Sequence, residues 1–349
     1  MKKRLSIGFA HHDDFDGAWF TIQDIRKELI FNGRKDLLDQ IEFVIVENNK
    51  LSSHADELKK FVINTLSAEG SLNYNIISTK GTGIAKNEVV KIANGEFVLL
   101  LDCHVLLCPV ARVIDKIFKF MDENPETSDL YSGPLVYDNG VNFSTHFVDV
   151  WSGEMWGSWS TAWRCKCNKF FFDVKQTEEG FKLRSVADSK LYDKSPNCDC
   201  ELKIDESDPL KSLIDSGSKL AVSNGSEEPF EIFGQGTGCL FVRKEAWLGY
   251  NEHARGFGGE ECYIHEKFRK SGNKAYCLPF LMWLHRFARV NPPTYPLETS
   301  YKLRNYILEF TELNMDLSPV RNHFVEDNGF DEIVYNSFVR EAKYLYNRD

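Results

Sequence analysis

Short apolar runs alternate with longer amphipathic segments over the first 120 residues of the chain. The runs have the length of buried strands, and they lie at Leu5 to Phe9, Phe43 to Val46, Asn75 to Ser78 and Phe97 to Leu101. Between them, apolar residues recur at the spacing of a helix face over 19–30, 58–66 and 85–93. Strands and helices in this alternating order predict a parallel sheet covered by helices on both faces.

The pattern changes twice farther along the chain. An amphipathic helix is expected over 110–121, and residues 126–235 then become rich in Gly, Ser, Asp and Trp, with short strand-like pieces such as Phe170 to Val174. We therefore expect a β-rich insert there. A strand at Cys239 to Val242, a helix over 261–270 and a strand at Ala275 to Leu278 then restore the first pattern, and helical patterning follows. These changes predict four parts, at 1–125, 126–235, 236–290 and 291–349.

The composition narrows the class of protein. With 349 residues and 42% hydrophobic content, the chain can bury a large core, which excludes a disordered chain or a small disulfide-stapled domain. Its 42 Lys and Arg against 52 Asp and Glu give a net charge of −10, which disfavours broad electrostatic binding to nucleic acid.

Three further features predict a cytoplasmic protein without a membrane span. No apolar run approaches the roughly 18–20 residues that a membrane helix needs. The opening Met-Lys-Lys-Arg leads directly into a strand-like run, and not into the apolar segment of a secretory signal. Nine cysteines, an odd number, indicate free thiols or a bound metal in a reducing compartment.

The segment Asp102-Cys103-His104 directly follows the apolar run that ends at Leu101. Ligands of parallel α/β sheets bind beyond the carboxyl ends of the strands, and side chains two residues apart on an extended segment point to one side. A carboxylate and an imidazole placed there suit a divalent metal such as Mn²⁺. The alternative is an aspartate that caps a turn beside a half-buried histidine.

Two later segments also carry candidate chemistry. Gly258-Gly259-Glu260-Glu261 opens a predicted helix, whose N-terminal dipole favours carboxylates there, so the pair supplies either a base or ordinary first-turn acids. His285 stands among apolar residues after the last predicted strand, and it is either a metal ligand or a core histidine.

The insert contains two Cys-x-Cys pairs. Cys165 and Cys167 form one pair, and Cys198 and Cys200 form the other. Four thiolates can hold a structural zinc ion, although Cys-x₂-Cys is the commoner spacing. The alternative is four unlinked thiols.

Taken in order, these segments resemble the nucleotide-sugar glycosyltransferases of the GT-A fold. Residues 4–120 are similar to family 2 glycosyltransferases in the first strand, in Val44-Ile45-Val46-Glu47-Asn48-Asn49 and in Gly81-Thr82-Gly83-Ile84-Ala85-Lys86-Asn87. Residues 236–290 are closer to the polypeptide N-acetylgalactosaminyltransferases, which carry Asp-x-His, a Gly-Gly-Glu-Asn segment and a further metal-binding His. The resemblance implies a mixed, mainly parallel α/β sheet flanked by helices, with the β-rich insert and a helical C-terminal extension.

The resemblance also implies a metal-dependent transfer of sugar from a nucleotide-sugar, most simply a UDP-sugar, to an acceptor hydroxyl. The acceptor would be a glycan, a protein or a modified nucleobase. Residues 1–125 would bind the donor, 126–235 would lie on the acceptor side, and 236–290 would complete the catalytic domain.

Each candidate residue then takes an expected role. Asp102, His104 and His285 would hold Mn²⁺ or Mg²⁺, and one of Glu260 and Glu261 would deprotonate the acceptor. The nucleoside would lie against His11, Asp13, Glu47 and Asn48 and be bordered by Gly83 and Asn87. Glu47 stands where family 2 enzymes usually have an aspartate and Lys86 where they usually have an arginine, so we expect the contacts with the nucleotide to be rearranged in this chain.

Two other functions fit parts of the pattern. A sugar-nucleotide nucleotidyltransferase also combines an α/β sheet with a divalent metal, but it normally has a cationic phosphate loop after the first strand, where this chain has His11-His12-Asp13-Asp14. A glycan- or nucleic-acid-binding module without catalysis would use the tryptophans and basic residues of the insert.

Overall fold

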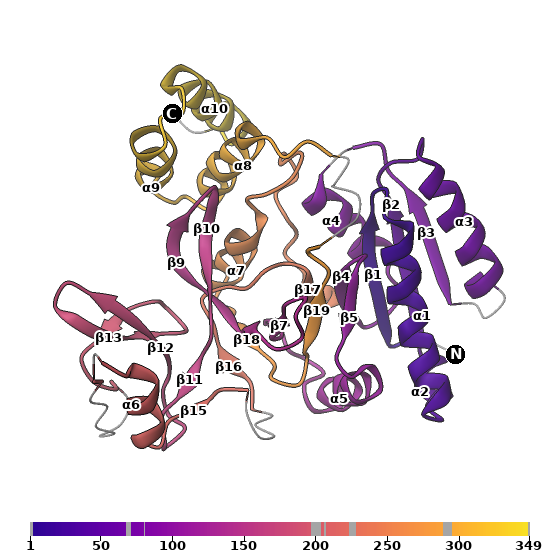
Figure 1. Ribbon diagram of the computed structural model, residues 1–349. Helices are drawn as coiled ribbons and strands as arrows, with labels where there is room; N and C mark the ends of the chain where they lie inside the picture. Colours follow the sequence, from indigo (N-terminus) through magenta and orange to yellow (C-terminus); the bar gives the residue numbers. More distant parts are fainter. Residues whose placement is uncertain are drawn as a thin grey trace.

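The computed structural model describes residues 3–67, 71–79, 81–196, 204–205, 207–222, 228–288 and 295–347. Its centre is an eight-stranded sheet with the strand order β16-β18-β6-β17-β4-β1-β2-β3 (Figure 1). The strands are β1 (Leu5–His11), β2 (Ile41–Glu47), β3 (Leu72–Ile76), β4 (Phe97–Asp102), β6 (Leu130–Ser132), β16 (Phe230–Glu231), β17 (Cys239–Arg243) and β18 (Ala275–Cys277).

The sheet is mixed and mainly parallel, as the sequence predicts. Strands β3, β2, β1 and β4 pair in parallel, and so do β6 and β18. Strand β17 runs antiparallel between β4 and β6, and β16 runs antiparallel to β18. The first 120 residues suggest a purely parallel sheet. This prediction is correct for β1 to β4 but not for the strands that later parts of the chain add to the same sheet.

Helices cover both faces of the sheet because side chains of the buried strands alternate between two cores. Phe43 and Ile45 of β2 join one core with α1 (Phe15–Phe31), α3 (Ser53–Leu66) and α5 (Val110–Glu123). Val44 and Val46 join the other core with α4 (Thr82–Ile92) and α7 (Glu260–Lys270). The short helix α2 (Lys35–Leu38) and the 3₁₀ turn η2 (Lys244–Ala246) lie in connections.

A second, smaller sheet sits beside the carboxyl end of β4. Its order is β5-β19-β7-β8, from β5 (Val105–Leu107), β19 (Trp283–His285), β7 (Leu135–Val136) and β8 (Phe143–Ser144). The antiparallel register places His285 of β19 opposite Val105 of β5. This pairing brings residue 285 to the turn that follows β4.

The insert is β-rich, as predicted. A hairpin of β9 (His146–Ser152) and β10 (Met155–Ser160) is followed by a five-stranded sheet that forms a separate lobe in Figure 1. That sheet contains β11 (Trp163–Arg164), β12 (Phe171–Thr177), β13 (Gly180–Ser185), β14 (Leu191–Tyr192) and β15 (Lys219–Leu220), and α6 (Pro209–Asp215) precedes its last strand.

The proposed zinc knuckle lies only partly within the described residues. The Sγ atoms of Cys165 and Cys167 lie 3.1 Å apart. Cys198 and Cys200 lie outside the described residues. The four-thiolate site stays a prediction.

The C-terminal part is helical, as expected, and packs on the hairpin. It comprises α8 (Thr299–Glu312), α9 (Ser318–Arg321), the π-helical turn η3 (Asn322–Asp327) and α10 (Glu332–Leu345). Trp151 and Trp156 of the hairpin contact Tyr306 and Phe310 of α8 through their rings. None of the described helices combines the length and the apolar character needed to cross a bilayer.

Candidate functional site

Three residues that the sequence singles out as metal ligands meet at the carboxyl end of β4. One donor atom from each of Asp102, His104 and His285 lies within 4.8 Å of the other two. The two imidazole Nε2 atoms are 3.1 Å apart, and Nε2 of His285 lies 3.5 Å from Oδ2 of Asp102. Residues 181 positions apart in the chain therefore converge on one point.

Backbone pairing positions these three side chains. Asp102 ends β4, and its N–H donates to the carbonyl of Gly238 at 2.9 Å. His104 lies in the turn between β4 and β5, and His285 ends β19, the partner of β5. The N–H of Arg286 donates to the carbonyl of His104 at 3.3 Å, which ties the two histidine segments together.

A buried lysine faces the carboxylate. Lys86 of α4 is 1% exposed, and its Nζ lies 2.9 Å from Oδ1 of Asp102 and donates to the carbonyl of Thr237 at 2.6 Å. Burial alone would raise the pKa of Asp102, but the charge of Lys86 and the contact with His285 hold it well below its usual value. Asp102 is therefore an anionic oxygen donor at neutral pH.

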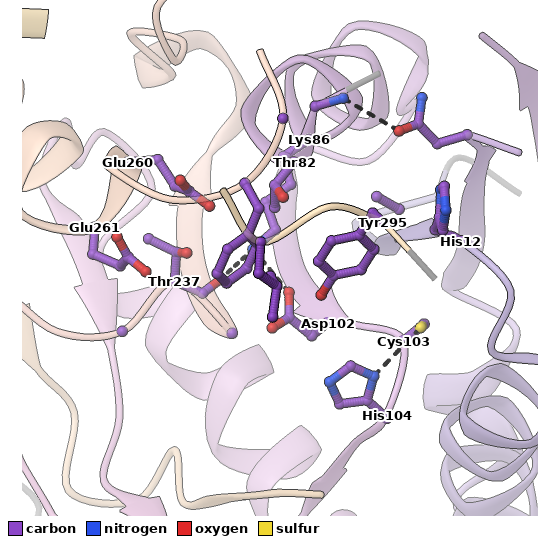
Figure 2. Close-up of a pocket in the computed structure, with 18 of the residues that line it drawn as sticks. His12, Thr82, Lys86, Asp102, Cys103, His104, Thr237, Glu260, Glu261 and Tyr295 are labelled. Atoms are coloured by element: carbon purple, nitrogen blue, oxygen red, sulfur yellow. Dashed lines mark hydrogen bonds and ion pairs between the residues drawn. The ribbon is translucent and has the colours of Figure 1, made fainter. Parts of the chain in front are cut away.

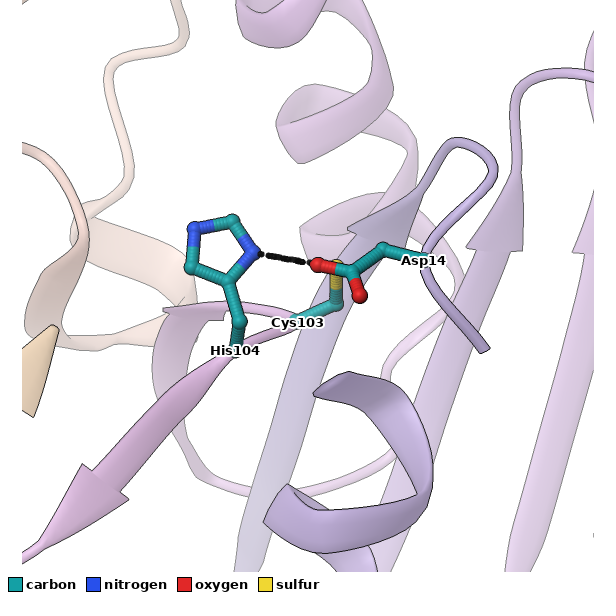
Figure 3. Close-up of side chains that lie close together, drawn as sticks. All are labelled: Asp14, Cys103 and His104. Carbon is teal, nitrogen blue, oxygen red and sulfur yellow. Dashed lines mark hydrogen bonds and ion pairs between the residues drawn. The ribbon is translucent and has the colours of Figure 1, made fainter. Parts of the chain in front are cut away.

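The ring of His104 is fixed from its other nitrogen. Its Nδ1 is hydrogen-bonded to Oδ2 of Asp14 at 2.9 Å (Figure 3). The other oxygen of Asp14 accepts from Arg286 at 2.6 Å and from the N–H of Gly17 at 3.1 Å. Burial by itself would raise the pKa of Asp14. The hydrogen bond to His104 and the charge of Arg286 outweigh this effect, so the pKa lies well below its usual value. An ionised Asp14 accepts the Nδ1 proton of His104 and leaves the Nε2 lone pair directed at His285.

His285 has no comparable orienting partner among the described residues. Its Nδ1 atom is buried there without a hydrogen bond. The contacts of Nε2 therefore determine which nitrogen of His285 carries the proton. These contacts are with His104, with Asp102 or with a bound cation.

The donor set fits a divalent cation. Ligand atoms at adjacent corners of an octahedron with bonds of about 2.1 Å lie about 3 Å apart. The separations of 3.1 and 3.5 Å are close to that value. One carboxylate with two imidazoles suits Mn²⁺ better than Mg²⁺, since imidazole nitrogen is a softer ligand than oxygen.

The three donors open into a cavity of about 770 Å³ (Figure 2). Its polar lining includes Asn48, Lys86, Arg255 and the Glu260-Glu261 pair. Its walls also carry seven aromatic rings, those of Phe147, Trp159, Phe257, Trp283, Phe287, Tyr295 and Tyr301. Aromatic faces beside a few charged groups suit a ligand with both sugar rings and anionic groups.

The glutamate pair lies at one end of this cavity in Figure 2, with His12 at the other end and Asp102 between them. Gly259 adopts a φ of 107° and lets the chain turn into α7, so that Glu260 and Glu261 occupy its first turn. Burial and then the charge of Glu261 raise the pKa of Glu260 to about 8, and burial raises the pKa of Glu261 as well. Glu260 is thus mostly protonated at pH 7 and half-ionised near pH 8, which makes its ionised form a stronger proton acceptor than an ordinary glutamate.

Of the four residues expected at the first and second strand ends, Asn48 lines the cavity. Its side chain donates to the carbonyl of Thr79 at 2.7 Å. His11 and Glu47 are both fully buried, and their side chains are joined at 2.6 Å. This pair joins β1 to β2, and it lines no part of the cavity because both side chains face each other inside the sheet layer.

Asp13, Gly83 and Asn87 also lie off the cavity lining. Asp13 accepts from the side-chain amide of Asn49 at 2.8 Å. A Cβ on Gly83 would lie 2.9 Å from Cβ of Tyr250, and the side chain of Asn87 binds both backbone groups of Tyr250, at 2.8 and 2.9 Å. The two α4 residues therefore hold α4 against the 250 segment, and the expected contact of these three residues with a nucleotide stays a prediction.

Sequence reasoning missed the residues that hold the ligands in place. Asp14 and Arg286 carry no motif of their own, and Lys86 stands out in the sequence only as the replacement of an arginine. A charged residue on the otherwise apolar inner face of α4 was the available signal for Lys86, because an unpaired lysine is almost never fully buried.

Comparisons with known proteins find similarity in structure only. No protein-family model matches the chain, and no curated protein sequence matches it. The structure of GalNAc-T7 with UDP, GalNAc and Mn²⁺ is similar over 98% of this chain and 57% of that one, at 14% identity and a TM-score of 0.49. The chain thus spans little more than half of that protein's length.

Two further structures are similar over most of this chain. Residues 1–349 of S. aureus TarS in complex with UDP-GlcNAc match over 97% of this chain and 79% of that one, at 13% identity and a TM-score of 0.49. A mannosyltransferase from Pyrobaculum calidifontis in complex with GDP-Man and Mn²⁺ matches over 99% and 74%, at 10% identity and a TM-score of 0.45. The mixed α/β fold of this chain is in keeping with these likenesses.

Proposed function

We propose that this protein is a metal-dependent glycosyltransferase of the GT-A type, which moves a sugar from a nucleotide-sugar to an acceptor hydroxyl. One observation carries the proposal: Asp102, His104 and His285 converge at the carboxyl end of the central strands, inside a cavity that also holds the glutamate pair. The structures of GalNAc-T7 and the mannosyltransferase contain Mn²⁺ with UDP and GDP-Man respectively, which supports a nucleotide-sugar as donor and Mn²⁺ as the metal. For this chain we favour a UDP-sugar.

The three ligands would hold the cation at the centre of the cavity. A bound divalent cation supplies Lewis-acid stabilisation of the diphosphate that leaves the sugar. Lys86 holds Asp102 ionised and in place, and Asp14 keeps the proton of His104 on Nδ1, away from the ion. The contact with Asp14 thus orients His104 toward the ion, whereas the contact with Lys86 stabilises the Asp102 carboxylate while no ion is bound.

The ends of the cavity suggest where the two substrates lie. Asn48 and His12 line the end formed by β1 and β2, where the nucleoside would bind, and Glu260 lines the opposite end, where the acceptor would bind. An ionised Glu260 would take the proton of the acceptor hydroxyl as that oxygen attacks the sugar carbon, and the sugar-to-phosphate bond breaks as the new bond forms. The pKa of about 8 makes Glu260 a stronger base than an exposed glutamate.

The experiment measures turnover of a panel of UDP- and GDP-sugars after chelation of metal and after addition of Mn²⁺. We expect Mn²⁺-dependent release of nucleoside diphosphate, and its loss in His104→Ala and in His285→Ala. His253→Ala is the matched control, because this imidazole lies outside the cavity lining. Equal turnover with and without metal, or full activity in His285→Ala, would contradict the proposal, while formation of nucleotide-sugar from sugar phosphate would indicate a nucleotidyltransferase.

A further inference from the structure

A second group of metal-binding side chains shares His104 with the site already described. The Sγ atom of Cys103 lies 3.8 Å from Oδ2 of Asp14 and 3.6 Å from Nδ1 of His104, and Nδ1 and Oδ2 are 2.9 Å apart. Figure 3 shows the carboxylate, the thiol and the ring gathered on one side of the turn that follows β4. All three residues line the cavity, so that an ion from solution can reach them.

These separations match three corners of a tetrahedral zinc site. With Zn–S bonds of about 2.3 Å and Zn–N or Zn–O bonds of about 2.0–2.1 Å, tetrahedral angles place sulfur about 3.5 Å from the other donors and the nitrogen about 3.3 Å from the oxygen. Only the 2.9 Å between His104 and Asp14 is shorter, because a hydrogen bond joins them. The fourth corner would be open to the cavity, to water or a substrate oxygen.

The donors also differ in chemistry from the first set. A thiolate is the softest ligand that a protein offers, and it selects zinc over Mn²⁺ and Mg²⁺. The thiolate of Cys103 and the carboxylate of Asp14 together balance the two charges of the ion, and the neutral imidazole completes the set. Arg286 stays on the other oxygen of Asp14, where it fixes the carboxylate without occupying the donor atom.

We propose that Asp14, Cys103 and His104 form a zinc-binding site whose occupation excludes a cation from the Asp102-His104-His285 site. The reason is that a neutral imidazole has one lone pair, on the nitrogen that lacks the proton. Zinc on Nδ1 leaves the proton on Nε2, which then donates to Nε2 of His285 across 3.1 Å. His104 is thereby withdrawn as a ligand of the first site.

The consequence for activity rests on the proposed function. Zinc would inhibit Mn²⁺-dependent transfer through the tautomer of His104, even though the two ions bind on opposite sides of the ring. Simultaneous binding would require a fully deprotonated, bridging imidazole. The site itself does not depend on the reaction and can be tested without it.

The first test uses Co²⁺, which replaces zinc and absorbs in the near ultraviolet when a thiolate is bound to it. We expect a thiolate-to-cobalt band in the protein that is reduced in Cys103→Ser and in Cys103→Ala, with unchanged circular dichroism. The band should persist in His285→Ala, because that residue belongs only to the first site, and in the control Cys108→Ser, whose thiol contacts the carbonyl of Leu106. The thiols of the insert contribute equally to all these spectra and cancel in the difference from the parent protein.

The outcomes separate the two proposals. A difference spectrum between the parent protein and Cys103→Ser without a thiolate band overturns the zinc site, and so does a band lost in His285→Ala. If a donor is found, the Zn²⁺ concentration for half-inhibition at saturating donor should rise at least about tenfold in Cys103→Ser. Zinc inhibition that is equal in both proteins overturns the coupling, whereas a cobalt band without any sugar transfer removes the proposed function and leaves the site.

Discussion

Removing the positive charge of Lys86 should lower the free energy of unfolding of the metal-free protein. It should also raise the affinity of the protein for a divalent cation. In Lys86→Met the side chain keeps its length and apolar stem but loses the contact with Asp102 at 2.9 Å and the hydrogen bond to Thr237 at 2.6 Å. Asp102 is then left beside His285 as a partly buried carboxylate without its compensating charge.

The magnitude follows from the burial of the two partners. Breaking a buried ion pair by removing one partner costs about 3–5 kcal/mol. The side chain of Lys86 is 1% exposed but that of Asp102 is 28% exposed to the cavity, so that water screens the remaining charge and we expect about 2–3 kcal/mol. For a chain of 349 residues, that corresponds to a fall in Tm of roughly 3–4 °C.

A divalent cation should reverse most of this loss. It supplies positive charge to the same carboxylate, and a neighbouring ammonium no longer opposes it. At an effective dielectric constant of 20, two unit charges about 4 Å apart interact by about 4 kcal/mol, so the Mn²⁺ affinity of Lys86→Met should rise by tenfold or more.

The assay is thermal unfolding of the parent protein and the variant, each with a chelator and with saturating Mn²⁺. The rise in Tm on adding Mn²⁺ should be larger in Lys86→Met than in the parent. Lys91→Met is the matched control, since Lys91 lies on the same helix but pairs with Glu88 on the surface, where the loss of one pair is worth at most about 1 kcal/mol. An equal fall in Tm with and without Mn²⁺ would refute the reasoning, because Asp102 would then not be a metal ligand.

Three other predictions test the surroundings of the ligands. Asp14→Asn removes the carboxylate that orients His104 and should weaken Mn²⁺ binding about 10–100-fold in a titration followed by electron paramagnetic resonance; an unchanged affinity would exclude the orienting role. Because folding raises the pKa of Glu260 from 4.5 to about 8, its burial costs stability increasingly as pH rises between these values, so Glu260→Gln should raise Tm at pH 8 and change it little at pH 4.5. An equal change at both pH values would contradict that titration. A Cβ on Gly236 would lie 2.5 Å from the ring of Trp159, and Gly236→Ala should therefore cost about 1–3 kcal/mol in urea unfolding, whereas a neutral substitution would show that the ring moves freely.

Much of the fold could be predicted because the relevant signals are local. Apolar runs and helix-spaced apolar residues predict the bounds of β1, β2, β4, α4 and α5 to within a few residues. They do so because the side of each element that faces the core is apolar in its own sequence. The position of Asp102 and His104 after a buried strand was visible for the same reason. The β-rich character of the insert and the helices of the C-terminal part followed from composition and periodicity.

The contacts that complete the site are not local. His104 meets Asp14 across 90 residues and His285 across 181, and nothing in the sequence around any one of them marks the pairing. The antiparallel course of β17 between β4 and β6 is equally unmarked, because a buried strand has the same apolar pattern whichever way it runs.

The sequence by itself determined the layers of helices and sheet in this protein and the strand end that carries candidate metal ligands. The reason is that the buried face of each helix or strand appears in its own sequence as periodically spaced apolar residues. Only the tertiary structure decided which polar side chains face the cavity. His11 and Glu47 are adjacent to that strand end but satisfy each other inside the sheet, whereas Lys86 and Asp14 are directed to the ligands. A polar group removed from water needs a partner, and the fold alone determines which partner lies within reach.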